Sequence, residues 1–150
     1  MKTLCFVITF LFSISENSSA QVDSNLLFQK TKGTWQYPIR TGTMLGPNTH
    51  GYPGKKATFI AKKSDSVFAI YSGQAVSIEN IDSAYLVITK YKDYFISYYG
   101  LTTPLIKLGD IVIAGQHIGN LAEDLEGLFS LDIFLNKNSD DLDVHLWFKY

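Results

Sequence analysis

Short runs of β-branched and aromatic residues, separated by turn-forming residues, fill most of the chain after Gly33. The clearest are residues 67–78, which Gly73 interrupts, and residues 85–90 and 94–99. Runs of this composition favour strands, and no segment shows the periodicity of a long amphipathic helix. No internal repeat is visible. The pattern therefore predicts one compact, mostly β domain of the sandwich or barrel kind.

The second half of the chain continues this pattern with shorter runs between the turns. Residues 105–121 read LIKLGDIVIAGQHIGNL, and we expect three very short strands separated by turns at Gly109 and Gly115. Glycine suits such corners because it tolerates a positive φ. Residues 121–128 predict a turn or one loose helical turn, and residues 129–135 alternate well enough to predict a strand.

The N-terminus has the features of an export signal. Lys2 precedes an apolar run over residues 4–14, and small residues stand at Ser18 and Ala20. The run is shorter than the ~20 residues that cross a bilayer, so we expect a signal peptide over residues 1–20, cleaved near Ala20. An uncleaved anchor is the alternative. The exported protein would be periplasmic or secreted, with no membrane span.

The remaining chain divides into a lead or tether, residues 21–32, and a domain, residues 33–150. Cys5 is the only cysteine and lies inside the apolar run, so the exported chain would hold itself together without a disulfide. The net charge is −1 and basic residues form no block. Both observations argue against a nucleic-acid or anionic-membrane partner.

Six motifs in order resemble those of the LytM/lysostaphin-type cell-wall metallopeptidases. They are GTWQYPI, VFAIYSGQAV, the two runs within residues 85–101, LIKLGDIVIAGQHIGNL, SLDIFLNKN and LDVHLWF. The resemblance covers about residues 33–148 and implies the compact LytM-like β-sandwich, a barrel-sandwich hybrid with a duplicated hybrid motif. Biotinyl and lipoyl carriers share the glycine turns, but they need a Met-Lys pair exposed at a tight hairpin, and residues 33–150 contain no Met-Lys pair.

The resemblance also implies which positions would hold zinc. Such hydrolases use three protein ligands and an open position for water. The family's zinc ligands and assisting histidines fall here on Gly54, Thr58, Gly100, Ser130 and Asp132. Only Asp132 could coordinate a metal, and one carboxylate does not replace three ligands. The resemblance thus implies a degenerate pseudoenzyme with no catalytic residue, no metal and no cofactor.

The three histidines offer little alternative. His50 could be a displaced first ligand if residues 51–56 are an insertion, but no acidic residue follows before Asp65. His117 is expected to be an exposed strand residue and His145 a surface or packing residue. Without a shared spacing they do not predict a metal site. The acidic residues at 140, 141 and 143 lack the glycine and distal glutamate of an EF-hand, so we expect a solvated turn.

A degenerate domain of this kind implies binding instead of hydrolysis. We expect the vacated active-site groove to bind a protein partner such as a murein hydrolase or amidase, with Tyr98 and Tyr99 as groove walls and Ser130 and Asp132 on the floor. The alternatives are a peptidoglycan-binding pseudoenzyme, an active zinc endopeptidase with atypical ligands, and a structural domain whose fold says nothing of its function.

Overall fold

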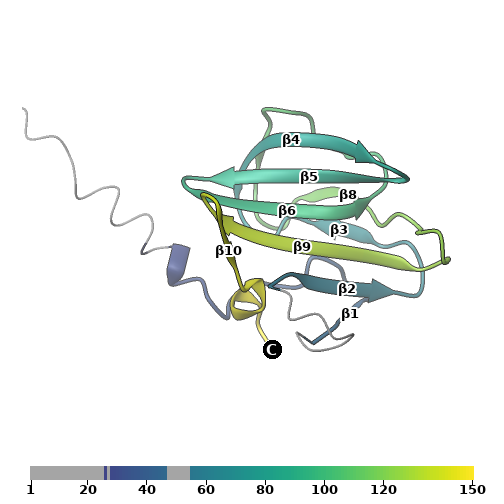
Figure 1. Ribbon diagram of the computed structural model, residues 1–150, viewed down its shortest axis with the longest axis horizontal. Helices are drawn as coiled ribbons and strands as arrows, with labels where there is room; N and C mark the ends of the chain where they lie inside the picture. Colours follow the sequence, from purple (N-terminus) through teal and green to yellow (C-terminus); the bar gives the residue numbers. More distant parts are fainter. Residues whose placement is uncertain (1–25, 27, 47–54) are drawn as a thin grey trace, which may run out of the picture.

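The computed structural model describes residues 26, 28–46 and 55–150. Short strands dominate this part of the chain, as the sequence predicts (Figure 1). They are β1 (Thr43–Met44), β2 (Ala57–Ala61), β3 (Ser66–Phe68), β4 (Gly73–Ile81), β5 (Ala84–Tyr91), β6 (Tyr94–Leu101), β7 (Ile111–Val112), β8 (His117–Asn120), β9 (Phe129–Lys137) and β10 (Asp140–Leu142), followed by the 3₁₀ helix η1 (Val144–Trp147).

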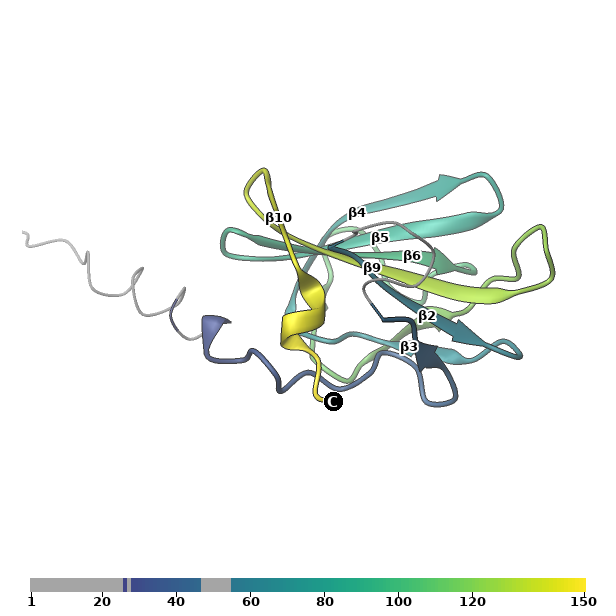
Figure 2. The same ribbon diagram turned by 60° about the horizontal axis from the view of Figure 1, so that its bottom comes forward.

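The strands form two antiparallel sheets. The large sheet has eight strands in the order β1-β2-β9-β6-β5-β4-β7, with β10 paired to β9 at the side. The small sheet consists of β3 and β8. Figure 2 shows β3 lying beneath the large sheet, so β3 covers one face of the large sheet, and no strand or helix of the described residues lies over the other. The expectation of a mostly β LytM-like architecture is confirmed.

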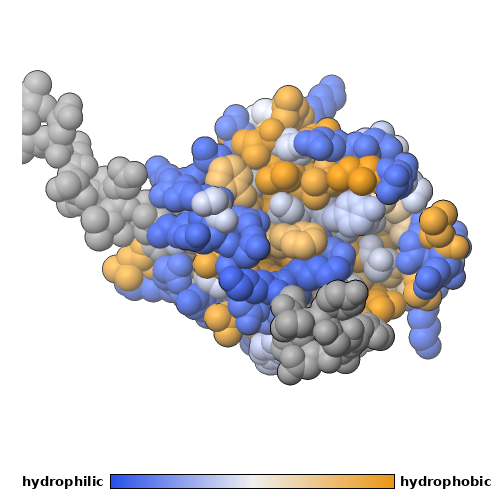
Figure 3. Space-filling model, viewed as in Figure 1, coloured by the Kyte–Doolittle hydropathy of each residue, from blue (hydrophilic) through white to orange (hydrophobic). Residues whose placement is uncertain are grey.

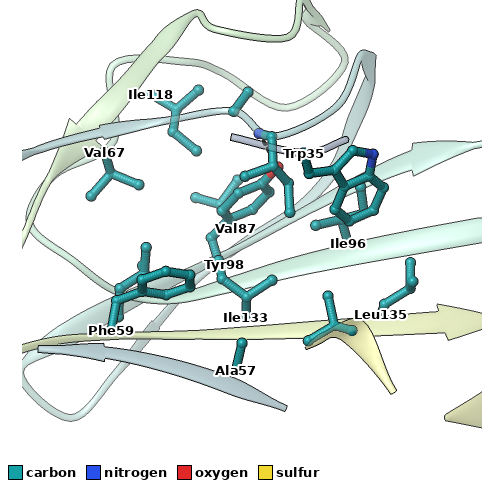
Figure 4. Packing of buried hydrophobic residues seen from close by; sticks show 14 of the residues in the cluster. Trp35, Ala57, Phe59, Val67, Val87, Ile96, Tyr98, Ile118, Ile133 and Leu135 are labelled. Carbon is teal, nitrogen blue, oxygen red and sulfur yellow. Dashed lines mark hydrogen bonds between the residues drawn. The ribbon is translucent and has the colours of Figure 1, made fainter. Parts of the chain in front are cut away.

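The covered face holds the core because side chains alternate along each strand. In β9, Leu131, Ile133 and Leu135 are at most 1% exposed, while the residues between them point to the other face. Figure 4 shows Ile133 packing together with Tyr98 and Val87 from the large sheet. Val67 and Ile118 from the small sheet complete this cluster.

The lead packs on the domain from Phe28 onward. Phe28 is 0% exposed, and its ring stacks on Tyr94 with 3.8 Å between the ring centroids. The rings of Phe28 and Trp35 meet edge to face, with 5.7 Å between their centroids. The side-chain amide of Gln29 donates a hydrogen bond to the Tyr94 hydroxyl at 2.9 Å. Aromatic contacts of this kind stabilise a fold beyond their buried area. This part of the lead is therefore an anchored element and not a free tether.

Two expectations about strands need correction. Residues 105–121 contain two short strands, β7 and β8, and not three, because residues 105–110 are turns closed by the hydrogen bond from Lys107 N to Asp110 Oδ2 at 2.8 Å. The sequence interpretation also had no strand at β2, which is central to the site described below. Within the described residues, no helix is long and apolar enough to cross a membrane.

Candidate functional site

Three polar side chains lie in a row across the face of the large sheet that points away from β3, which we call the outer face. Thr58 of β2 is the register partner of Asp132 of β9, and Asp132 is the register partner of Tyr99 of β6. All three are half-buried, whereas their chain neighbours point into the core. Direct cross-strand partners have close Cβ atoms, so the antiparallel pairing of β2, β9 and β6 assembles this row.

Both carboxylate oxygens of Asp132 have partners within the chain. The Thr58 hydroxyl donates to Oδ1 at 2.6 Å, and the Lys56 ammonium donates to Oδ2 at 2.7 Å. The Lys56 side chain is 42% exposed and that of Asp132 only 19%, so the ion pair lies at the edge of the row. The same ammonium lies 5.9 Å from the ring centroid of Phe134. This arrangement neutralises the one acidic group of the site.

Lys56 is the site residue that the sequence interpretation missed, because it treated residues 55 and 56 as solvated loop positions. The signal is its spacing. Lys56 precedes Thr58 by two residues, and side chains two apart share a face of a strand. Once β2 is recognised, Lys56 is expected beside Thr58 and within reach of any acidic residue opposite them.

Gly100 is a position where no side chain fits. Its φ is +112°, and a Cβ built there would lie 2.2 Å from the carbonyl oxygen of Ser130. A positive φ disfavours every residue with a Cβ, and the close approach adds a steric clash. β6 and β9 therefore meet here by backbone alone. Gly54, the fifth position implied by the resemblance, lies outside the described residues.

The expectation that Tyr98 forms a groove wall is wrong. Tyr98 is 0% exposed and lies in the core, where its hydroxyl accepts a hydrogen bond from the Ile70 backbone N–H at 3.0 Å. Burial raises the pKa of this hydroxyl above its ordinary value, and hydrogen bonds to the backbone and to Thr89 only partly offset that effect. Successive residues of a strand point to opposite faces, so only Tyr99 can belong to the outer face.

The two described histidines lie apart from the row. His117 is half-buried in the small sheet, where its Nε2 lies 3.1 Å from Asn120 Oδ1. His145 is only 3% exposed, and its Nδ1 lies 2.8 Å from Asp143 Oδ1. His145 is thus a packing residue, one of the two possibilities that the sequence left open. His50 lies outside the described residues.

Apolar side chains occupy the outer face beside the polar row. Leu86 is the register partner of Tyr99, and Ser97 lies between Ile88 and Phe134. Leu86 and Ile88 are half-buried and Phe134 is 38% exposed. Figure 3 views this face and shows a band of apolar surface across its middle, flanked by polar surface. We call Leu86, Ile88, Tyr99 and Phe134 the outer-face patch.

Comparison with known proteins gives one kind of match. No family model matches the chain, and no curated protein is similar to it in sequence. Solved structures do match in fold. Csd3 from Helicobacter pylori superposes with a TM-score of 0.63 over 77% of this chain at 16% identity, and the matched region is 33% of that chain. The chain thus spans about a third of the Csd3 structure's length.

Two further matches decide the fold. Lysostaphin matches 71% of this chain and 49% of its own, with a TM-score of 0.56 and 22% identity. A chain of the SpoIIQ–SpoIIIAH pore-forming complex matches 89% of this chain and 79% of its own, with a TM-score of 0.59 and 18% identity. The chain has the LytM/lysostaphin fold. This finding confirms the resemblance drawn from the six motifs at the level of the fold.

The described residues do not fit the zinc that this fold holds in the peptidases. Among them, no three His, Cys, Asp or Glu side chains come together as a ligand set. Asp132 stands alone in the row, and the Lys56 ammonium at 2.7 Å already compensates its charge. A divalent cation at Asp132 would have to displace this ammonium and would gain a single protein ligand instead of three.

Proposed function

We propose that this chain is a non-catalytic LytM-like domain of the cell envelope, which binds a protein partner through its outer face. The observation that carries the proposal is the state of Asp132, whose two oxygens are bound by Lys56 and Thr58. A carboxylate held in this way is a structural group of the row and is not poised to organise a metal-bound water. What the row offers instead is a neutral surface of fixed shape.

The neighbouring outer-face patch supports a protein as the ligand. Leu86, Ile88, Tyr99 and Phe134 lie on one face of the three neighbouring strands β5, β6 and β9. Aromatic residues surrounded by polar groups are typical centres of protein interfaces. The similar chain of the SpoIIQ–SpoIIIAH complex is, by that description, part of an assembly with another protein. A murein hydrolase or amidase is the partner that the family resemblance suggests.

The envelope location rests on the N-terminal sequence. The apolar run over residues 4–14 and the small residues at 18 and 20 suit export and cleavage near Ala20. Amino-terminal sequencing of the protein recovered from the envelope or medium of the producing cells tests this part separately. A chain that still begins at Met1 in the cytoplasm would contradict it.

A capture experiment tests the partner. The purified chain is immobilised and exposed to envelope extract, and bound proteins are identified with the wild type and with Phe134→Glu, which places a charge in the outer-face patch. Leu125→Glu is the matched control, because Leu125 is 98% exposed and lies outside the patch. We expect a murein hydrolase to bind the wild type and the control at least ten times better than Phe134→Glu. Equal recovery with all three forms would contradict the proposal.

Peptidoglycan is the second candidate ligand, favoured by the partly exposed rings of Tyr99 and Phe134 on the same face of the sheet. Aromatic faces can stack on sugar rings. Sedimentation of the chain with purified cell wall, in the absence of other proteins, would favour this ligand over a protein partner.

An active zinc endopeptidase is the third candidate and the fold's best-known activity. It predicts about one zinc per chain by elemental analysis and chelator-sensitive cleavage of wall peptides. We expect neither result.

A further inference from the structure

Exposed apolar side chains around β7, which β4 separates from the strand that carries Leu86 and Ile88, have no role in the proposed function. Leu105, Leu108, Ile111 and Ile113 are 61%, 68%, 70% and 65% exposed. We call these four residues the β7-edge patch. Figure 3 shows apolar surface at the upper rim of the molecule, beyond β4, where the sheet order places β7. Single exposed apolar residues are common, but apolar residues gathered on a surface mark interaction sites. These four lie within nine residues of the chain, with Leu105 next to β8 through the hydrogen bond from its N–H to Ile118 O at 3.0 Å.

The patch is held on a fixed backbone. β7 pairs with β4 on one side, with Ile111 opposite Gln74 and Val112 opposite Gly73. The preceding turn is fastened by the hydrogen bond from Gly109 N to Ala75 O at 2.8 Å, and the following turn by that from Ala114 N to Ser72 Oγ at 2.9 Å. Val112 is 0% exposed, so it anchors β7 in the core while its neighbours project outward.

β7 is also an end of the sheet. It is the last strand in the order, and among the described residues no strand pairs with its other side. Natural edge strands are usually protected from association by charged side chains, proline or a covering element. Here the edge is short, Asp110 precedes it and Ile113 follows it, and the paired residues Ile111 and Val112 include no proline or charge. Such an edge favours pairing with another strand.

The charges point to a second copy of the chain as the occupant. A two-fold contact places a patch against itself, so a patch of one sign would repel its own copy. The segment carries one lysine, Lys107, and one aspartate, Asp110, and is therefore neutral overall. Antiparallel pairing of one strand with an identical strand is also the arrangement that a two-fold axis generates. Both features fit a homodimer better than a charged foreign partner.

The area is consistent with a weak dimer. Four aliphatic side chains that are about two-thirds exposed present on the order of 400 Å² per chain, or about 800 Å² in a symmetric contact. Specific interfaces begin at roughly 1,000–1,200 Å², and the partly exposed Val76 and Pro104 next to the patch contribute part of the difference. The contact should thus form at high protein concentration and dissociate on dilution.

We propose that two copies of this chain associate through the β7-edge patch, with β7 antiparallel to β7 across a two-fold axis. This inference goes beyond the proposed function, because it adds a second interface that leaves the outer face free. A two-fold axis that joins two sheets edge to edge stands perpendicular to them. Both outer faces then point to the same side, and the dimer presents two partner sites together.

Sedimentation of the purified chain over a concentration series up to about 1 mM tests the proposal. We expect the mean mass of the wild type to rise toward that of a dimer. Ile111→Glu and Ile111→Lys should each stay monomeric over the same range, with a dissociation constant raised at least about tenfold. Leu125→Glu is the control for an added charge on an equally exposed residue, and it should dimerise like the wild type.

Mixing the two Ile111 variants distinguishes self-association from any other effect of the substitutions. β7 has only two residues, so any antiparallel pairing of these residues with their copies brings Ile111 within two residues of its copy. The Glu and Lys variants should therefore dimerise with each other and not with themselves. A wild type that stays monomeric at every concentration, or an Ile111→Glu variant that dimerises as well as the wild type, would overturn the proposal.

Discussion

The ammonium of Lys56 lies 2.7 Å from the carboxylate of Asp132, on the strand pair where the family resemblance would assemble a zinc site. The pair joins β2 to β9 on the outer face, next to the hydrogen bond between Thr58 and the same carboxylate. The one carboxylate among the positions that the resemblance implies is thus held in an ion pair within the chain. Lys56, Thr58 and Asp132 can each be substituted without changing a core residue, so the contribution of this ion pair can be measured.

The coupling between Lys56 and Asp132 should be measurable but small. The Lys56 side chain is 42% exposed, so water screens the pair, and we expect a coupling free energy of about 0.5–1 kcal/mol. A double-mutant cycle with Lys56→Met and Asp132→Asn, followed by urea unfolding, measures it. Lys62→Met is the control, since Lys62 is exposed and forms no ion pair in the described structure. A coupling of zero would contradict a structural role for the pair.

Placing at position 100 the histidine that the family resemblance implies there should damage the fold. Gly100 has a φ of +112°, and any Cβ there would lie 2.2 Å from Ser130 O. Gly100→Ala should therefore lower the free energy of unfolding by about 2–4 kcal/mol, and Gly100→His by at least as much.

Gly109→Ala separates the two causes of the stability loss expected at Gly100, which are the positive φ and the contact with Ser130 O. Gly109 also has a positive φ, +91°, but no atom lies within 4 Å of a Cβ built there. It should cost only about 1 kcal/mol, the cost of the backbone conformation alone. Thermal or urea unfolding measures both variants. If Gly100→Ala and Gly109→Ala lowered the free energy of unfolding equally, the contact with Ser130 would not contribute to the loss.

The sequence predicts the strands that carry β-branched and aromatic residues in long runs. β4, β5, β6 and β9 lie where those runs occur, because their alternation is strong enough to be read without tertiary information. β2 is the central strand that the sequence does not predict. Its sequence, ATFIA, is short and uniformly apolar apart from Thr58, so periodicity cannot separate it from the loop before it. Its pairing with β9 is what makes it a strand.

The candidate site is predictable only in part for the same reason. The resemblance gave Thr58, Ser130 and Asp132 as positions, and the structure brings Thr58 and Asp132 into contact. It could not give Lys56, whose role depends on the register of two strands far apart in sequence. It also assigned Tyr98 and Tyr99 to the same wall, although neighbours in a strand face opposite sides. Register and facing are properties of the sheet, and the motifs do not encode them.

The free energy of unfolding should depend on pH through the carboxyl group of Asp65. Burial would raise the pKa of its carboxyl, but hydrogen bonds from the Thr41 hydroxyl and from the N–H groups of Thr41, Ser66 and Arg40 outweigh burial and hold the pKa below its ordinary value of 3.8. The charged form is therefore favoured by folding. Its contribution is complete above the ordinary pKa and is lost as the pH falls through the lower pKa of the folded state.

Asp65→Asn tests this pH dependence. We expect the variant to be less stable at pH 7 by about 1–2 kcal/mol, because the amide is a weaker acceptor for the two backbone donors of the loop at residues 40–41. The difference from the wild type should shrink when unfolding is measured at pH 4, 3 and 2. Asp82→Asn is a suitable control, since Asp82 is exposed in a hairpin turn. A gap between wild type and Asp65→Asn that is the same at every pH would contradict the role of the charge.

The adjacent tyrosines at positions 98 and 99 should separate folding from binding. Tyr98→Phe removes the acceptor of the Ile70 N–H inside the core, so the free energy of unfolding should fall by about 1–3 kcal/mol. Tyr99→Ala shortens a side chain of the outer face, so it should alter stability little and weaken capture of the proposed partner at least tenfold. Urea unfolding and the capture assay on both variants measure the two effects. If Tyr98→Phe weakened capture at full stability while Tyr99→Ala did not, the partner would have to bind elsewhere than on the face that carries Tyr99 and Asp132.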